Sequence, residues 1–222
     1  MVDLLKKEFL DIINNSIRRG DAPVWTSTPL VRVEDITDHT FDIDDPKDNK
    51  NTIKRKFGHG TASYVNGHSD NPYKLRFICF EEYLNQFVFD DGKGNTNKSL
   101  LKPHTHRADL IVYDTSDNHA WIIIHELSTG NVANKRNLGR IQLSKTIDLL
   151  CKSEYINRFI IFFVNKCCVL SACDERVLQT PKGIADAFIN SYSILPEPLM
   201  FQFGAMKRLG FMGYETSKLV LV

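Results

Sequence analysis

The sequence predicts an α/β protein with a mixed β-sheet flanked by helices, and three segments carry this prediction. Residues 106–114 and 121–128 are two strand-like runs, rich in aliphatic and β-branched side chains, on either side of a short polar turn. Residues 134–152 have apolar side chains at helical spacing. Residues 158–164 are an uninterrupted apolar run, typical of a central strand covered on both faces. This order predicts a hairpin, a crossover helix and a parallel strand.

Upstream of the hairpin, the chain predicts two helices and a long irregular segment. Residues 3–18 have helical apolar spacing and end before Gly20. Residues 23–33 suggest an irregular strand. Residues 34–70 change from acidic to basic and then to glycine-containing, which predicts a long loop or a weakly structured insertion. Residues 73–90 predict a helix whose aromatic side chains join the core.

The remaining features favour one ordinary globular domain over residues 1–222. A further helix is expected near residues 183–192, and no repeat or glycine- and serine-rich linker marks a boundary. Hydrophobic residues make up 42% and charged residues 25% of the 222 residues. The 28 Lys and Arg against 27 Asp and Glu give a net charge of +1, so any basic surface must be local.

The N-terminal segment lacks the apolar region of a secretory signal, and no apolar run approaches the ~18–20 residues that span a bilayer. A cytoplasmic protein without membrane contact is therefore expected. The five cysteines show no Cys-x-x-Cys spacing, which favours reduced thiols over a zinc site or a disulfide framework.

The hairpin predicts a pair of carboxylates. If residues 116–119 form the turn, Thr115 faces Ala120, and the register places Asp109 directly opposite Glu126 on one face of the sheet. Oxygen ligands on adjacent strands suit a hard divalent cation, magnesium or manganese. This geometry points to the cleavage of phosphodiester bonds.

Strand alternation places Ser128 on the face of Glu126, and His125 and Leu127 on the other face. A purely structural role for the acids stays open: Asp109 could cap a turn or pair with an arginine, and Glu126 could lie at an exposed edge. Yet Glu126 follows three isoleucines, where an unpaired buried acid would cost several kcal/mol. A metal ion or a lysine between the two carboxylates would remove their repulsion.

The chain resembles the core of the PD-(D/E)XK nuclease superfamily, the restriction-endonuclease-like fold, over about residues 73–165. The resemblance lies in the order helix, hairpin, helix and buried strand, together with this pair of acids. In that family an Asp, and an acid followed two residues later by Lys, bind one or two divalent metals and activate water. Asp109 matches the first acid and Glu126 the second. Ser128 stands where Lys is usual.

The resemblance implies further site residues on the neighbouring elements. The missing lysine is expected on the following helix, at Lys145 or alternatively Lys135, and Gln142 on that helix is expected to face the site. An upstream acid often completes the metal ligands, and Glu82 is slightly preferred to Glu81 here.

Residues before the first acid are candidates for phosphate contacts. His106 and Arg107, together with His104, could bind phosphate or relay a proton, although histidines are more often structural. The basic residues Lys54, Arg55 and Lys56 could hold a nucleic acid backbone, with a solvated surface loop as the alternative.

The leading hypothesis is a magnesium- or manganese-dependent endonuclease, a hydrolase acting on nucleic acid, with DNA favoured over RNA. Asp109, Glu126 and the main-chain carbonyl of Leu127 would hold the metal, and Lys145 or Ser128 would orient the water. By the resemblance, a homodimer is also expected.

Two rival hypotheses stay open. The first is a catalytically degenerate nuclease-like domain that binds nucleic acid or a protein partner, which the serine at position 128 and the near-neutral charge favour. The second is an unrelated α/β protein with its activity elsewhere. No Walker loop, dinucleotide-binding glycine pattern or Gly-x-Ser-x-Gly elbow nominates another chemistry.

Overall fold

The computed structural model describes residues 1–15, 17, 20–25, 28–45, 52–93, 98–99, 107–129, 132–173 and 199–222. The helix expected near residues 183–192 lies outside these ranges. The described helices are α1 (Val2–Leu4), the π-helical turn η1 (Leu5–Phe9), α2 (Leu10–Asn15), α3 (Phe80–Asn85), α4 (Val132–Leu150), α5 (Glu154–Ile161) and α8 (Ala205–Leu209).

The strands form three sheets, so the protein is a mixed α/β protein as predicted. The largest sheet has the order β12 (Leu199–Phe201), β13 (Met212–Glu215), β11 (Asn165–Cys173), β10 (Trp121–Thr129), β9 (Leu110–Asp114), β6 (Leu75–Cys79) and β2 (Val33–Ile36). A second has the order β14 (Lys218–Leu221), β5 (Ala62–Asn66), β3 (Thr40–Ile43) and β4 (Lys54–Arg55). The third contains β1 (Ala22–Pro23), β7 (Val88–Asp90) and β8 (Lys98–Ser99).

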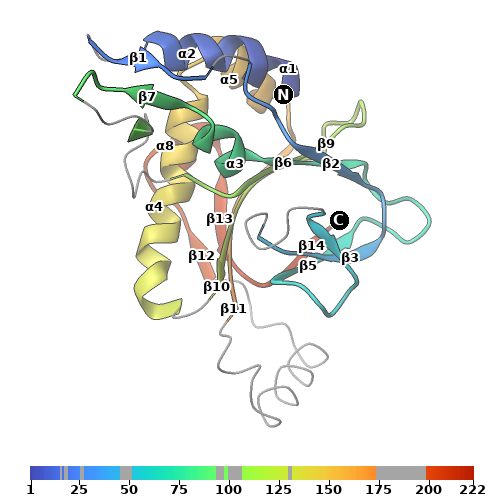
Figure 1. Ribbon diagram of the computed structural model, residues 1–222. Helices are drawn as coiled ribbons and strands as arrows, with labels where there is room; N and C mark the ends of the chain where they lie inside the picture. The colour runs from blue at the N-terminus through green and yellow to red at the C-terminus, as the bar shows by residue number, and fades with distance from the viewer. Residues whose placement is uncertain are drawn as a thin grey trace.

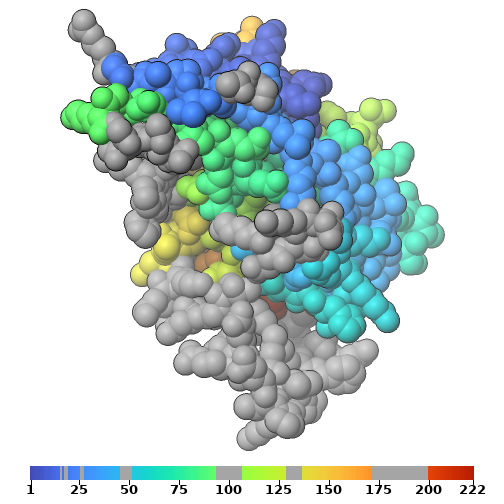
Figure 2. All heavy atoms as spheres, viewed as in Figure 1, coloured from blue at the N-terminus to red at the C-terminus, as the bar shows by residue number. Residues whose placement is uncertain are grey.

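The seven-stranded sheet is covered on both faces, and a separate apolar core lies on each face. Helix α4 packs on one face, and the four-stranded sheet packs on the other (Figure 1). Alternate residues of β10 divide between the two cores: Ile122 and Ile124 face the helices, whereas Ile123 and Leu127 face the four-stranded sheet. In the space-filling view, residues of the first half of the chain form much of the visible surface, with α4 at one side (Figure 2).

The hairpin and its crossover are confirmed. β9 and β10 are antiparallel, with Tyr113 opposite Ile122 and Leu110 opposite His125, which is the register predicted from the turn. The helix predicted at 134–152 is α4, and the strand after the crossover, β11, pairs with β10 in parallel. The first helix is present over Val2–Asn15 and contains a π-helical turn.

The parallel strand is not the segment that the sequence indicated, and the prediction for residues 158–164 is wrong. Residues 154–161 form helix α5, because the Ser153 hydroxyl accepts a hydrogen bond from the Ile156 amide at the helix N-terminus. Ile156 and Ile160 are buried one turn apart, while Phe162 is exposed. The strand begins only at Asn165.

The helix predicted for residues 73–90 is also wrong over most of its length. Residues 75–79 form strand β6, and helix α3 begins only at Phe80, where the amides of Phe80 and Glu81 donate to the Asp109 carbonyl oxygen. Residues 75–79 therefore form a strand in the core next to β9, although the aromatic residues have helical spacing.

The interpretation of residues 34–70 as a loop or insertion is wrong as well. This segment contributes to β2 and supplies β3, β4 and β5. Polar residues within these strands hid their buried character in the sequence. Asp42, for example, is buried because its Oδ2 accepts hydrogen bonds from the His59 and Gly60 amides. Of the irregular strand expected at 23–33, only Pro23 and Val33 lie in strands among the described residues.

Candidate functional site

Asp109 and Glu126 occupy facing positions at the end of the β9–β10 ladder. The last paired residues are Leu110 and His125, and Asp109 and Glu126 are the next residues along each strand. Both are on the face that packs against α4, and they are only 3% and 7% exposed. The two acids therefore form a buried carboxylate pair between the sheet and α4.

A hydrogen bond joins the first acid to the strand of the second. The Leu127 amide donates to Asp109 Oδ2 at 2.8 Å. The N–H and C=O groups of one strand residue point to the same side, so the Leu127 carbonyl also faces the edge where Asp109 lies. The residues that carry the two carboxylates and this main-chain carbonyl thus lie together at the end of the ladder.

Two helices fix the segment that carries Asp109. From α4, Thr146 Oγ1 accepts the Ala108 amide hydrogen at 2.7 Å, and Gln142 Nε2 donates to the Arg107 carbonyl oxygen at 2.9 Å. From α3, the Phe80 amide donates to the Asp109 carbonyl oxygen at 2.9 Å. The main chain on either side of the first acid is therefore held by hydrogen bonds to side chains and to a helix N-terminus. Sequence reasoning did not identify Thr146.

A glycine lets α4 approach the second acid. A Cβ atom at Gly139 would lie 2.7 Å from Leu170 Cδ1 and 3.5 Å from Glu126 Cγ. Any larger residue at this position would therefore press on the neighbours of the carboxylate pair.

The upstream acids point in different directions. Glu82, the preferred candidate, lies 2.9 Å from Arg32 Nη1 and is nearly half exposed. Glu81 points inward, and its Oε1 lies 3.2 Å from Arg107 Nη2, with both side chains largely buried. Arg107 also donates to Asn85 Oδ1 at 2.5 Å, so internal contacts hold this candidate phosphate ligand. His104 and His106 lie outside the described residues.

The lysine candidates on α4 differ in position. The Lys145 side chain is 60% exposed, and its ammonium lies 3.8 Å from Asp148. Gln142 and Thr146 face the segment before Asp109, and position 135 falls on their stripe of the helix by its spacing. The structure does not describe the Lys135 side chain.

Ser128 is buried on the side of Glu126, whereas the basic run belongs to the opposite layer. Lys54 Nζ lies 2.5 Å from Asp38 Oδ2, and Arg55 Nε lies 2.6 Å from Asp44 Oδ2. The first two basic residues are thus neutralised, and Lys56 is exposed. The structure does not bring this run together with the carboxylate pair.

A third acid, Glu215, is partly buried on the same level of the sheet. Glu126 pairs with Leu170 on β11, and Leu170 pairs with Glu215 on β13. Arg140 of α4 covers Glu215, with Nε donating to Oε1 at 2.6 Å, and its guanidinium lies over the Phe201 ring. No sequence signal marked Glu215, because its strand lies in the part of the chain where the sequence was least readable.

A buried polar network crosses the other face of the sheet. The Tyr64 hydroxyl lies 2.7 Å from His125 Nδ1, and His125 Nε2 lies 2.8 Å from Ser171 Oγ. Ser171 Oγ donates to the Thr216 carbonyl oxygen at 2.6 Å. One assignment satisfies every group: tyrosine donates to Nδ1, and Nε2 donates to serine. Burial lowers the pKa of His125 to about 3, which keeps the imidazole neutral.

The donor atoms at the carboxylate pair fit a hard divalent cation. Carboxylate and carbonyl oxygens are the ligands that magnesium and manganese take, with water completing the shell. Among the described residues, no group of three or more His, Cys, Asp or Glu side chains could hold a metal. Of the residues that the structure describes, Asp109, Glu126 and the Leu127 carbonyl are the groups placed to hold a metal at this end of the ladder.

Comparisons with models of protein families, with curated proteins and with solved structures find no match for this chain. No helix in the described part of the chain is long and apolar enough to cross a membrane.

Proposed function

We propose that this protein is a divalent-metal-dependent nuclease, with DNA as the favoured substrate, and that its core is a restriction-endonuclease-like fold. The observation that carries the proposal is the buried pair of Asp109 and Glu126 at facing positions, with Asp109 bonded to the amide of Leu127, the residue after Glu126. The order of α3, the β9–β10 hairpin, α4 and the parallel strand β11 supports the fold assignment.

Three groups of this chain would hold the metal: the carboxylates of Asp109 and Glu126 and the Leu127 carbonyl. A bound magnesium or manganese ion lowers the pKa of its water and stabilises charge on the scissile phosphate. Burial of both carboxylates on adjacent strands supports metal binding, because it offers a hard cation two anionic oxygen ligands at a site largely shielded from water. Gln142 and Thr146 hold the main chain before Asp109 and so limit the movement of the first carboxylate.

The direct test is a cleavage assay on plasmid DNA, single-stranded DNA and RNA, each with Mn²⁺, with Mg²⁺ and with a chelator. Cleavage in the presence of metal that is lost in both Asp109→Asn and Glu126→Gln supports the proposal. Unchanged cleavage in both variants overturns it, because the activity would then come from elsewhere or from a contaminant.

A second candidate function is a nuclease-like domain that binds nucleic acid or a partner without cleaving. Ser128 favours it, because a buried hydroxyl brings no positive charge to the developing phosphorane. Isothermal titration with Mn²⁺ separates the two functions. A nuclease binds at least one ion that Asp109→Asn removes, whereas a degenerate domain binds none at this pair.

A further inference from the structure

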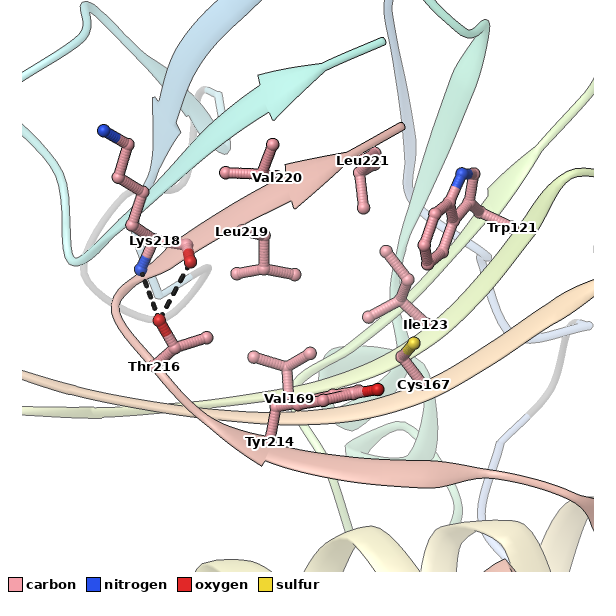
Figure 3. A pocket seen from close by; sticks show the side chains of 10 residues that line it. All are labelled: Trp121, Ile123, Cys167, Val169, Tyr214, Thr216, Lys218, Leu219, Val220 and Leu221. Carbon is pink, nitrogen blue, oxygen red and sulfur yellow. Dashed lines mark hydrogen bonds between the residues drawn. The ribbon is translucent and has the colours of Figure 1, made fainter. Parts of the chain in front are cut away.

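A cavity of about 320 Å³ lies on the face of the seven-stranded sheet opposite to the carboxylate pair (Figure 3). Strands β10, β11 and β13 line one side of it, and β14 lines the other. Its volume falls within the roughly 300–1,000 Å³ that is typical of small-molecule pockets.

The cavity exists because two consecutive strands belong to different sheets. Strand β13 pairs with β11 and β12, whereas β14 pairs with β5 of the four-stranded sheet. Only Thr216 and Ser217 connect them, so the strands diverge from this point, as Figure 3 shows. Residues 212–221 are called the β13–β14 fork below.

Hydrogen bonds fix the apex of the fork. The Thr216 amide donates to the Leu170 carbonyl oxygen at 3.1 Å, and Ser171 Oγ donates to the Thr216 carbonyl oxygen at 2.6 Å. Thr216 Oγ1 donates to the Lys218 carbonyl oxygen at 2.8 Å and accepts from the Lys218 amide at 3.1 Å. Closing the fork would strain or break some of these bonds, so the hydrogen bonds at its apex favour the separated strands.

The buried network next to the cavity ties the two sheets together. Tyr64 comes from β5 and bonds to His125 on β10, which bonds in turn to Ser171 on β11. Its last acceptor is the carbonyl at the fork apex. Both walls of the cavity are therefore held at a fixed separation.

The interior of the cavity is apolar and carries no charge. In Figure 3 the side chains of Leu219 and Leu221 point down from β14, and those of Ile123 and Val169 point up from the large sheet. Among the described residues that line the cavity, only Lys218 is charged, and its ammonium points away. A charged ligand would find no counter-charge inside, whereas an uncharged apolar ligand matches the walls.

We propose that the cavity binds a small, uncharged apolar molecule with an aromatic or branched aliphatic body. An apolar pocket of this size, with walls held apart by hydrogen bonds, matches an apolar ligand in both volume and polarity. The aromatic ring of Trp121 forms one end wall, beside Leu221 (Figure 3). This inference does not depend on the nuclease proposal.

The test uses N-phenyl-1-naphthylamine, a neutral apolar dye that fluoresces when it leaves water, with metal-free protein. We expect a saturable rise in fluorescence at one dye per chain. Leu219→Trp, at a position that points into the cavity and is 6% exposed, should lose this binding. The matched control Val65→Trp lies on the neighbouring strand β5, is not among the residues that line the cavity, and should keep the binding.

Absence of a saturable rise in the wild type, or equal binding by Leu219→Trp, overturns the proposal. If Leu219→Trp does not fold, methyl NMR spectra of the wild type decide the question. Signals of Val169 and Leu219 should shift with added dye while those of Val65, outside the lining, stay in place. Shifts confined to residues outside the lining, or no shifts, would place the dye elsewhere and reject the cavity.

Discussion

The Leu127 amide donates a hydrogen bond to Asp109 Oδ2 over 2.8 Å, so the first acid of the carboxylate pair is attached to the strand that carries the second. Leu110 and His125 are the last paired residues of the two strands, and Asp109 and Leu127 lie beyond this pair. The side chain of Asp109 therefore takes the place of the next main-chain acceptor. This bond gives the pair a defined geometry before any ligand binds.

Replacing Asp109 by Asn separates charge from geometry. Asn keeps an oxygen that accepts the Leu127 amide hydrogen but loses the negative charge. We expect the melting temperature to stay near that of the wild type, and cleavage to fall roughly 100-fold or more. Asp114→Asn, at the other end of the same hairpin, is the control and should retain activity. Equal cleavage by Asp109→Asn and wild type would exclude a metal role for this acid.

Thr146 tests whether α4 positions the first acid. Thr146→Val leaves the buried Ala108 amide without its acceptor, which should destabilise the protein by about 1–3 kcal/mol in urea unfolding. We also expect weaker Mn²⁺ binding by calorimetry. Thr146→Ser keeps the hydroxyl and should restore both properties. If Thr146→Val binds Mn²⁺ as tightly as the wild type, the hydrogen bond stabilises the fold alone.

The two lysine candidates on α4 should behave differently. Lys145 is exposed and paired with Asp148, about 100° around the helix from Thr146 and about 60° from Gln142. Lys145→Met should therefore cleave DNA at the wild-type rate. Position 135 shares the stripe of Gln142 and Thr146, so Lys135→Met should lose activity. The reverse result would mean that Lys145 reaches the substrate from the surface.

His125 should make stability depend on pH. The pKa of His125 is about 3 in the folded protein and near 6.5 in the unfolded chain. Between these values the imidazole is protonated in the unfolded chain but neutral in the folded protein. Stability is complete above pH 6.5 and falls with decreasing pH, by roughly 3 kcal/mol at about pH 4.5. Urea unfolding of His125→Gln should show a smaller loss over this range than wild type, whereas the exposed control His59→Gln should match wild type.

Gly139 and Leu170 should be coupled. Gly139→Ala places a Cβ 2.7 Å from Leu170 Cδ1, so we expect a loss of about 1–3 kcal/mol despite the better helix propensity of alanine. Leu170→Val removes the contacting atom and should cost about 1 kcal/mol alone. The double variant should lose less than the sum of the two. Additive losses would show that the helix shifts instead of the leucine.

Local patterns were sufficient for the hairpin and the crossover helix. The turn residues 116–119 and the alternation of β-branched side chains determine the register, which is why Asp109 and Glu126 could be placed opposite each other. The apolar spacing of residues 134–152 likewise located α4. The structures of the hairpin and of α4 are both determined by residues close to one another in the sequence.

The errors concern segments whose structure depends on distant partners. Residues 158–164 are uniformly apolar, and only the Ser153 cap and the burial of Ile156 and Ile160 identify a helix. Thr146 contacts the segment before β9, and Gly139 contacts strands β10 and β11; sequence spacing reveals neither contact. Glu215 joins the row of acids only because β13 pairs with β11.

The pairing of β14 with β5 has a consequence for the order of folding. Ser63 and Lys218 are register partners although 155 positions separate them (218 − 63). Such distant contacts form slowly because the intervening chain must first lose its freedom. During synthesis on the ribosome, the edge of β5 that pairs with β14 therefore stays uncovered until nearly all of the chain described here has emerged.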